Sequence, residues 1–106
     1  MGRVIYSVAS SVDGYHTDAQ GDFSWAVPDE EVIAALNADA AGVSTYLYGR
    51  KMSLRLGVVD VVELLLCPVV VGGGTRVLPG GWRTSLSLRR ERRFGNGMVQ
   101  LTYDVA

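Results

Sequence analysis

"CPVVVGGGTRVLPGG", residues Cys67 to Gly81, carries an apolar run into three consecutive glycines, residues 72 to 74, and then into a polar turn. Strands that are buried on both faces of a sheet read as continuous Val, Ile and Leu, so the residues from Glu63 to Val71 predict a central strand. The glycines lack the spacing of a dinucleotide fingerprint, and no lysine follows them as in a P-loop. We therefore expect a tight backbone turn after the strand rather than a phosphate cradle.

Composition describes an ordinary globular domain. The chain has 106 residues, of which 48% are apolar and 20% charged, and its formal net charge is −1. These values fit one domain with a modest core and argue against a general nucleic-acid or membrane-surface binder. Cys67 and His16 are the only residues of their kinds, which excludes an intrachain disulfide, a cysteine metal cluster and a His-rich zinc site. No secretory signal or membrane-length apolar run is present, so we expect a cytoplasmic protein with no nucleic-acid or membrane partner.

The remaining chain alternates between strand and helix patterns. Periodicity predicts strands at Val4–Ala9 and Thr45–Tyr48, which with Glu63–Val71 form the centre of one sheet, and a helix at Asp29–Ala41 packed on it. Ser85–Arg93 and Met98–Val105 predict two antiparallel strands, because Asn96-Gly97 between them is a hairpin-turn signal. The arginine-rich end of the first of these, "RRERR", is typical of an exposed edge strand. The polar segment from Ser10 to Trp25 is long for a connector, and such loops are often functional lids.

Four blocks of the sequence together resemble a known family. They are "VIYSVASSVDGYHTDAQGDFSWAVPDEEV", "TYLYGRKM", "GVVDVVELLLCPVVVGGGTRVLP" and "RRFGNGMVQLTYDV". Their residues and order resemble the dihydrofolate reductase-like family, and more closely the branch typified by the C-terminal reductase domain of the riboflavin-biosynthesis protein RibD. The resemblance implies an α/β fold with a mixed sheet flanked by helices and a C-terminal antiparallel hairpin. It also implies an NADPH-dependent reductase of a pteridine or riboflavin-pathway pyrimidine substrate, such as dihydrofolate or 5-amino-6-ribosylaminouracil.

The resemblance also implies that a piece is missing. Members of the family carry further central strands, helices and a second glycine loop where Met52 here runs directly into Ser53. We therefore expect a single domain, residues 1–106, that is internally truncated near 52–53 and forms a homodimer because uncovered strand edges need partners. A Cα–Cα distance between Met52 and Ser53 well above about 3.8 Å would instead mean that separate pieces were joined. The alternative function is a catalytically silent truncated fold that acts as a homodimeric binding or interaction module.

The resemblance implies cofactor-binding residues in four places. The backbone of Ala9 faces the nicotinamide carboxamide, and a core alanine is the competing interpretation. The loop with Ser11, Asp13 and Gly14 is mobile and closes over the nicotinamide. Gly49 and Arg50 contact the cofactor phosphates, and Arg50 pairs with the extra phosphate of NADPH. The glycine triplet makes a tight turn beside that loop or touches the cofactor directly. The full set is Ala9, Ser11, Asp13, Gly14, Gly49, Arg50, Gly73 and Gly74.

The substrate side rests on three residues. Glu30 has the family's spacing from the preceding proline and is the preferred catalytic carboxylate, since a carboxylate accepts two N–H bonds from an amino-pyrimidine edge. Asp29 is the second catalytic candidate, and a helix cap is its competing interpretation. Trp25 is expected to flank the substrate pocket or to anchor its loop. No metal is expected.

Overall fold

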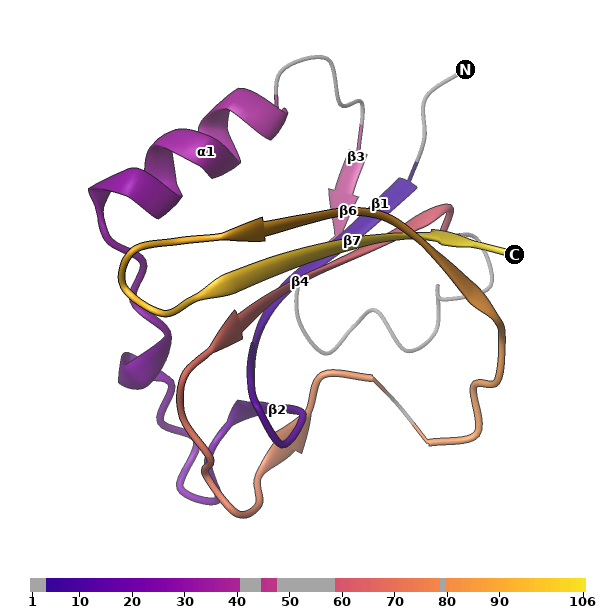
Figure 1. Ribbon diagram of the computed structural model, residues 1–106. Coiled ribbons are helices and arrows are strands. Elements are labelled where there is room, and N and C mark those ends of the chain that lie inside the picture. Colours follow the sequence, from indigo (N-terminus) through magenta and orange to yellow (C-terminus); the bar gives the residue numbers. More distant parts are fainter. Residues whose placement is uncertain (1–3, 41–44, 48–58, 79) are drawn as a thin grey trace.

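The computed structural model describes residues 4–40, 45–47, 59–78 and 80–106. Within these ranges five strands form one sheet in the order β3-β1-β4-β7-β6, and two short strands form a second sheet, β2-β5. Figure 1 shows the long helix α1 beside the larger sheet. The elements are β1 (Val4–Ser11), β2 (Tyr15–Thr17), η1 (Ser24–Ala26), α1 (Glu30–Ala40), β3 (Thr45–Leu47), β4 (Val61–Cys67), β5 (Thr75–Arg76), β6 (Leu86–Arg93) and β7 (Val99–Val105).

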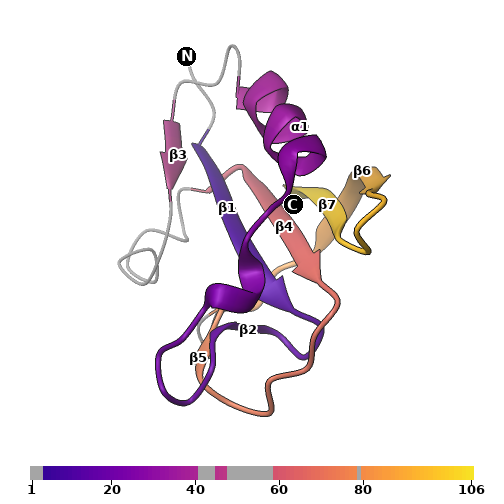
Figure 2. The ribbon, with the colours of Figure 1, turned by 90° about the vertical axis from the view of Figure 1, so that its left-hand side faces the viewer.

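The larger sheet is mixed. Strand β1 is parallel to β3 on one side and to β4 on the other, whereas β7 is antiparallel to both β4 and β6. Figure 2 shows β1 and β4 running side by side toward the β2–β5 pair, so that both strands end at the same edge. Two predictions are therefore confirmed. The three apolar strands β1, β3 and β4 lie in one sheet, and β6 and β7 form the C-terminal antiparallel hairpin.

Two predictions are wrong, one on the bounds of a strand and one on the place of a strand in the sheet. Strand β4 ends at Cys67 rather than Val71, because Pro68 has no N–H for the ladder and the next residues bond to the loop after β1. The amide of Val12 donates to the carbonyl of Val69 at 2.8 Å. In the described residues β3 is an edge strand and not a central one.

Helix α1 covers one face of the sheet. Val32, fully buried, packs with Leu65 and Cys67 of β4, and Ala35 and Leu36 follow on the same side, as helical spacing requires. The N-terminus is capped by Asp29, whose Oδ1 accepts the Val32 amide at 3.0 Å. The cap interpretation of Asp29 is thus confirmed.

A second core lies on the opposite face of the sheet. It gathers Tyr6, Val8, Val62 and Val77, with Trp82 packed against them. The hydroxyl of Tyr6 donates to the Val77 carbonyl at 2.5 Å, and burial raises the pKa of that phenol. This bond ties the segment after the glycines to the first strand.

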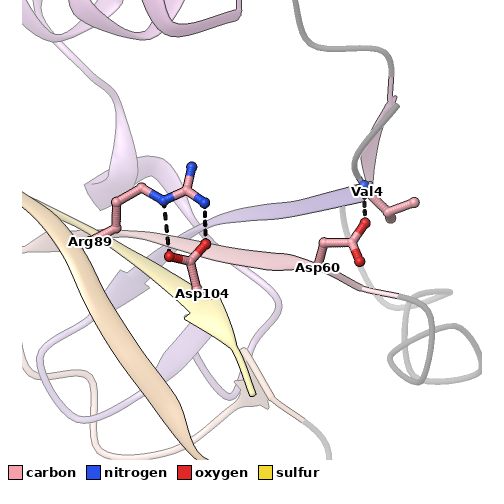
Figure 3. Close-up of polar contacts among 4 residues, drawn as sticks. All are labelled: Val4, Asp60, Arg89 and Asp104. Atoms are coloured by element: carbon pink, nitrogen blue, oxygen red, sulfur yellow. Dashed lines mark hydrogen bonds and ion pairs between the residues drawn. The ribbon is translucent and has the colours of Figure 1, made fainter. Parts of the chain in front are cut away.

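Polar contacts fix the strand ends (Figure 3). The carboxylate of Asp60 accepts the Val4 amide at 2.9 Å, which joins the starts of β4 and β1. Arg89, at an irregularity in the β6–β7 register, forms an ion pair with Asp104. Since β6 is an edge strand in the described sheet and Arg89 to Glu91 are exposed, the edge-strand interpretation of the arginine run is confirmed.

Candidate functional site

The candidate site lies where β1 and β4 end. Ligands of open sheets with parallel strands bind outside the carboxyl ends of those strands. Here the chain after β1 turns tightly, because the Gly14 amide donates to the Ser11 carbonyl at 3.0 Å. The chain after β4 forms the glycine loop. The two loops that the sequence singled out therefore lie together at one edge.

Asp13 joins these two loops. Its Oδ2 accepts the Gly72 amide at 2.8 Å, and its Oδ1 accepts the Val71 amide at 3.2 Å and the Ser11 hydroxyl at 2.5 Å. The Ser11 hydroxyl, followed by the two amides, lowers the pKa of Asp13, although partial desolvation acts in the opposite direction. We call this set of contacts the Asp13 clamp. It holds the loop after β1 against the loop after β4 as a charged carboxylate.

The clamp explains the glycine triplet. Backbone N–H groups in a glycine loop are able to bind an anion, and at Gly72 and Val71 the anion bound is the carboxylate of Asp13. At Gly74 the backbone has a φ of +140°, and an added Cβ would lie 2.0 Å from the Thr17 carbonyl oxygen. The triplet is thus a tight turn beside the loop after β1, as the first of its two interpretations had it.

His16 also lies at this edge of the sheet, although no sequence pattern assigned it a role in the site. Its Nδ1 lies 3.2 Å from the carbonyl oxygen of Ala9, and its ring stacks on Phe23 with centroids 6.0 Å apart and an interplanar angle of 11°. A lone histidine in a polar loop carries no spacing signal. The contact depends on how the loop folds back over β1, so no sequence pattern was able to reveal it.

The predicted substrate residues are spread around the same end. Trp25 packs against the core beneath α1, and its indole N–H donates to the Asp22 carbonyl at 3.2 Å, which is the loop-anchoring arrangement. Asp29 is used as the helix cap. Glu30 is exposed at the start of α1, and the neighbouring Glu31 accepts the Gly95 amide at 3.0 Å.

Gly49, Arg50 and the Met52–Ser53 bond lie outside the described residues. Of the described residues, no group of three or more His, Cys, Asp or Glu is placed to hold a metal ion. No helix in the same ranges is long and apolar enough to cross a membrane.

Comparisons with known proteins identify the fold. No family model and no curated protein matches the chain, but solved structures do. A candidate riboflavin biosynthesis protein from Shewanella sp. PV-4 matches with a TM-score of 0.65 at 14% identity, over 98% of this chain and 99% of that one. A diaminohydroxyphosphoribosylaminopyrimidine deaminase/5-amino-6-(5-phosphoribosylamino)uracil reductase from Thermotoga maritima matches with a TM-score of 0.71 at 12% identity, over 99% of this chain and 57% of that one.

The Saccharomyces cerevisiae riboflavin biosynthesis reductase Rib7 matches with a TM-score of 0.56 at 11% identity, over 99% of this chain and 89% of that one. The chain has the dihydrofolate reductase-like fold that these structures share, and it spans a little over half of the Thermotoga protein. The resemblance found in the four sequence blocks is thereby confirmed for the fold.

Proposed function

We propose that this chain is an NADPH-dependent reductase of a riboflavin-pathway pyrimidine or pteridine substrate. The observation that carries the proposal is the coincidence of fold and site. The sheet matches the Thermotoga deaminase/reductase over 99% of this chain, and the two loops singled out by the sequence meet at the carboxyl ends of β1 and β4. That edge is where an open sheet with parallel strands binds its ligand.

The described residues at the end of β1 support the proposal for the nicotinamide end of NADPH. Among the described residues, β1 is paired with β4 alone from Ser7 onward, since the described register with β3 covers Val4 to Tyr6. A strand edge that is open at its carboxyl end offers backbone donors and acceptors to a planar carboxamide. Ala9 is the residue proposed to make that contact, and the bound cofactor supplies the hydride.

The phosphate end of NADPH is proposed to meet the glycine triplet and Arg50. The amides of Gly72 and Val71 are engaged by Asp13, so Gly73 and Gly74 are the members of the triplet that remain proposed as cofactor contacts. Arg50 is proposed to pair with the extra phosphate of NADPH, from its place after Gly49 in the sequence. Since a second phosphate loop is missing from the sequence, we expect NADPH to bind weakly.

The test is a titration of the purified protein with NADPH, followed by the fluorescence of the reduced nicotinamide. Saturable enhancement is expected, with weaker binding of NADH. A linear response up to millimolar NADPH, matching a protein-free control, would rule out the proposed function. Substrate turnover is then measured with 5-amino-6-ribosylaminouracil.

The Asp13 clamp also favours the second candidate, a catalytically silent homodimeric binding module. The Asp13 carboxylate accepts the Gly72 amide of the glycine loop, and the Asp29 carboxylate caps α1. Both acids thus have structural roles. Exposed apolar side chains at Val12, Val27 and Val70 add surface that a second copy is able to cover. Light scattering on a gel-filtration column should give a dimer mass, and a monodisperse monomer would contradict the dimer.

A further inference from the structure

The carbonyl of Ala9 bonds to a side chain, on the side of β1 where no described strand pairs beyond Tyr6; we call this side the open edge of β1. Strand β1 has β4 as its one described strand neighbour from Ser7 to Ser11. In place of a second strand, the His16 ring reaches back seven residues, with Nδ1 3.2 Å from the Ala9 oxygen. The imidazole thus uses one acceptor position of the Ala9 carbonyl at this edge.

The bond fixes the chemistry of the ring. A carbonyl oxygen only accepts hydrogen bonds, so Nδ1 of His16 carries the proton that it donates to Ala9. In the neutral ring Nε2 then has a free lone pair, and it lies on the far side of the ring from Nδ1. Within the described ranges Nε2 makes no hydrogen bond, and the side chain is half-buried.

Phe23 holds the ring in this orientation. The two rings are nearly parallel, at 11°, with centroids 6.0 Å apart, and 57% of the Phe23 surface is exposed. An exposed aromatic face beside a fixed hydrogen-bond acceptor suits a planar heteroaromatic ligand, because such a ring stacks and donates at the same time.

Three other polar side chains near this edge, those of Ser11, Asp13 and Asp29, have structural partners. Asp13 is bound by Ser11 and the glycine loop, and Asp29 caps α1. The hydroxyl of Ser11 donates to Asp13 and accepts the Tyr15 amide. Unlike these three side chains, His16 keeps an unused hydrogen-bonding atom, Nε2, with which to contact a ligand.

We propose that His16 is a ligand-contacting residue whose Nε2 accepts a hydrogen bond from an amide or amino N–H of a planar heteroaromatic ring at the open edge of β1. The inference rests on the proposed function, because both of its ligands have this chemistry. The nicotinamide of NADPH carries a carboxamide, and a pathway pyrimidine carries amino groups. The Ala9 carbonyl retains a second acceptor position for the same ring.

His16 is the only histidine of the sequence, so nitrogen NMR of the tag-free, ¹⁵N-labelled protein reports on this ring alone. The free protein should show the tautomer that is protonated at Nδ1. Addition of NADPH or of 5,6-diaminouracil, in separate titrations, should shift the Nε2 signal. The compound that produces the shift identifies the source of the N–H group, whether cofactor or substrate.

Variants give a second, independent measure. His16→Phe keeps a ring that stacks on Phe23 but removes both nitrogens, and it should raise the Kd of the shifting compound about 3- to 10-fold, the value of one hydrogen bond. Gln20→Ala is the matched control, since Gln20 is exposed in the same segment and its backbone amide, not its side chain, bonds to Asp18. It should bind as the wild type does.

Two negative outcomes separate this inference from the proposed function. Saturable NADPH binding with an unmoved His16 signal and an unchanged Kd in His16→Phe would overturn the role of His16 and leave the reductase proposal standing. Failure of both compounds to bind the wild-type protein would overturn the reductase proposal and this inference together. The wild-type spectra decide the matter even where a variant fails to fold.

Discussion

Replacing Gly74 by Ala should separate β2 from β5. The added Cβ would lie 2.0 Å from the Thr17 carbonyl oxygen and 2.6 Å from the Asp18 carbonyl carbon. Both are backbone atoms, so relief requires one strand to move away from the other. The backbone φ of +140° is a further obstacle, because side-chain-bearing residues rarely adopt it.

The magnitude follows from these two effects. Holding Ala in a sparsely populated backbone conformation costs about 1–3 kcal/mol. Disrupting the pairing of the short strands, in which Tyr15 lies opposite Arg76 and Thr17 opposite Thr75, costs about 0.5–1.5 kcal/mol per backbone hydrogen bond lost. A loss of about 3 kcal/mol in the free energy of unfolding is expected. With a urea m-value of about 1–3 kcal/mol/M, the unfolding midpoint should fall by roughly 1–3 M.

Gly80→Ala is the matched control for this experiment. No atom lies within 4 Å of a Cβ at Gly80, and its backbone φ lies outside the left-handed range. Since alanine also restricts the unfolded chain, the control should be neutral or stabilised by about 0.4–1 kcal/mol. A Gly74→Ala midpoint within about 0.3 M of the control would refute the close approach of the two loops.

Substitutions of Asp13, Thr102 and Arg50 test other parts of the structure and of the proposed site. The pKa of Asp13 is lowered in the folded protein. Its contribution to stability is therefore present above the ordinary pKa of about 3.9 and is lost as the pH falls through the lower folded-state value. The urea midpoint of Asp13→Asn should change less than that of the wild type between pH 5 and pH 2, and equal changes would remove Asp13 from the clamp. The buried Thr102 hydroxyl has no hydrogen-bond partner in the described structure, so Thr102→Val should raise the free energy of unfolding by about 0.5–1 kcal/mol in chemical denaturation, while a loss above 1 kcal/mol would reveal a partner for that hydroxyl. Arg50→Ala should weaken NADPH binding more than NADH binding in fluorescence titrations, and equal losses would exclude Arg50 from the phosphate site.

Local patterns predicted most of the scaffold. The spacing of Val32, Ala35 and Leu36 marked the buried side of α1, and the acidic residues after Pro28 marked its start. Asn96-Gly97 placed the turn between β6 and β7. In each case the signal lies within a few residues, so neighbouring side chains determine the local structure.

Long-range contacts account for what the sequence missed. Strand β4 stops at Cys67 because the next residues bond to a loop 58 positions earlier in the chain, at Asp13. Glu63 interrupts an apolar run and is nevertheless buried, with its carboxylate accepting the Ser7 hydroxyl at 3.0 Å across the sheet. Such pairings depend on strand order and register, which the pattern of a single segment does not contain.

The candidate site was predicted in part for the same reason. The resemblance brought Asp13 and the glycine triplet to one place, and the structure adds that a carboxylate of the chain binds the first amide of the triplet. The contact of His16 with Ala9 has no counterpart in any sequence motif considered above. Such a contact depends on the conformation of the loop that carries the side chain, so it is identified from the folded structure and not from the sequence.

A backbone amide NMR map recorded as NADPH is added tests whether the carboxyl end of β1 binds the cofactor. We expect the largest shifts from Ala9 to His16 and at Gly73 and Gly74, with little change along β6. NADPH is an anion, and β6 carries the arginine-rich stretch from Arg89 to Arg93. Shifts confined to that stretch would show charge-driven surface binding and would contradict a cofactor site at β1.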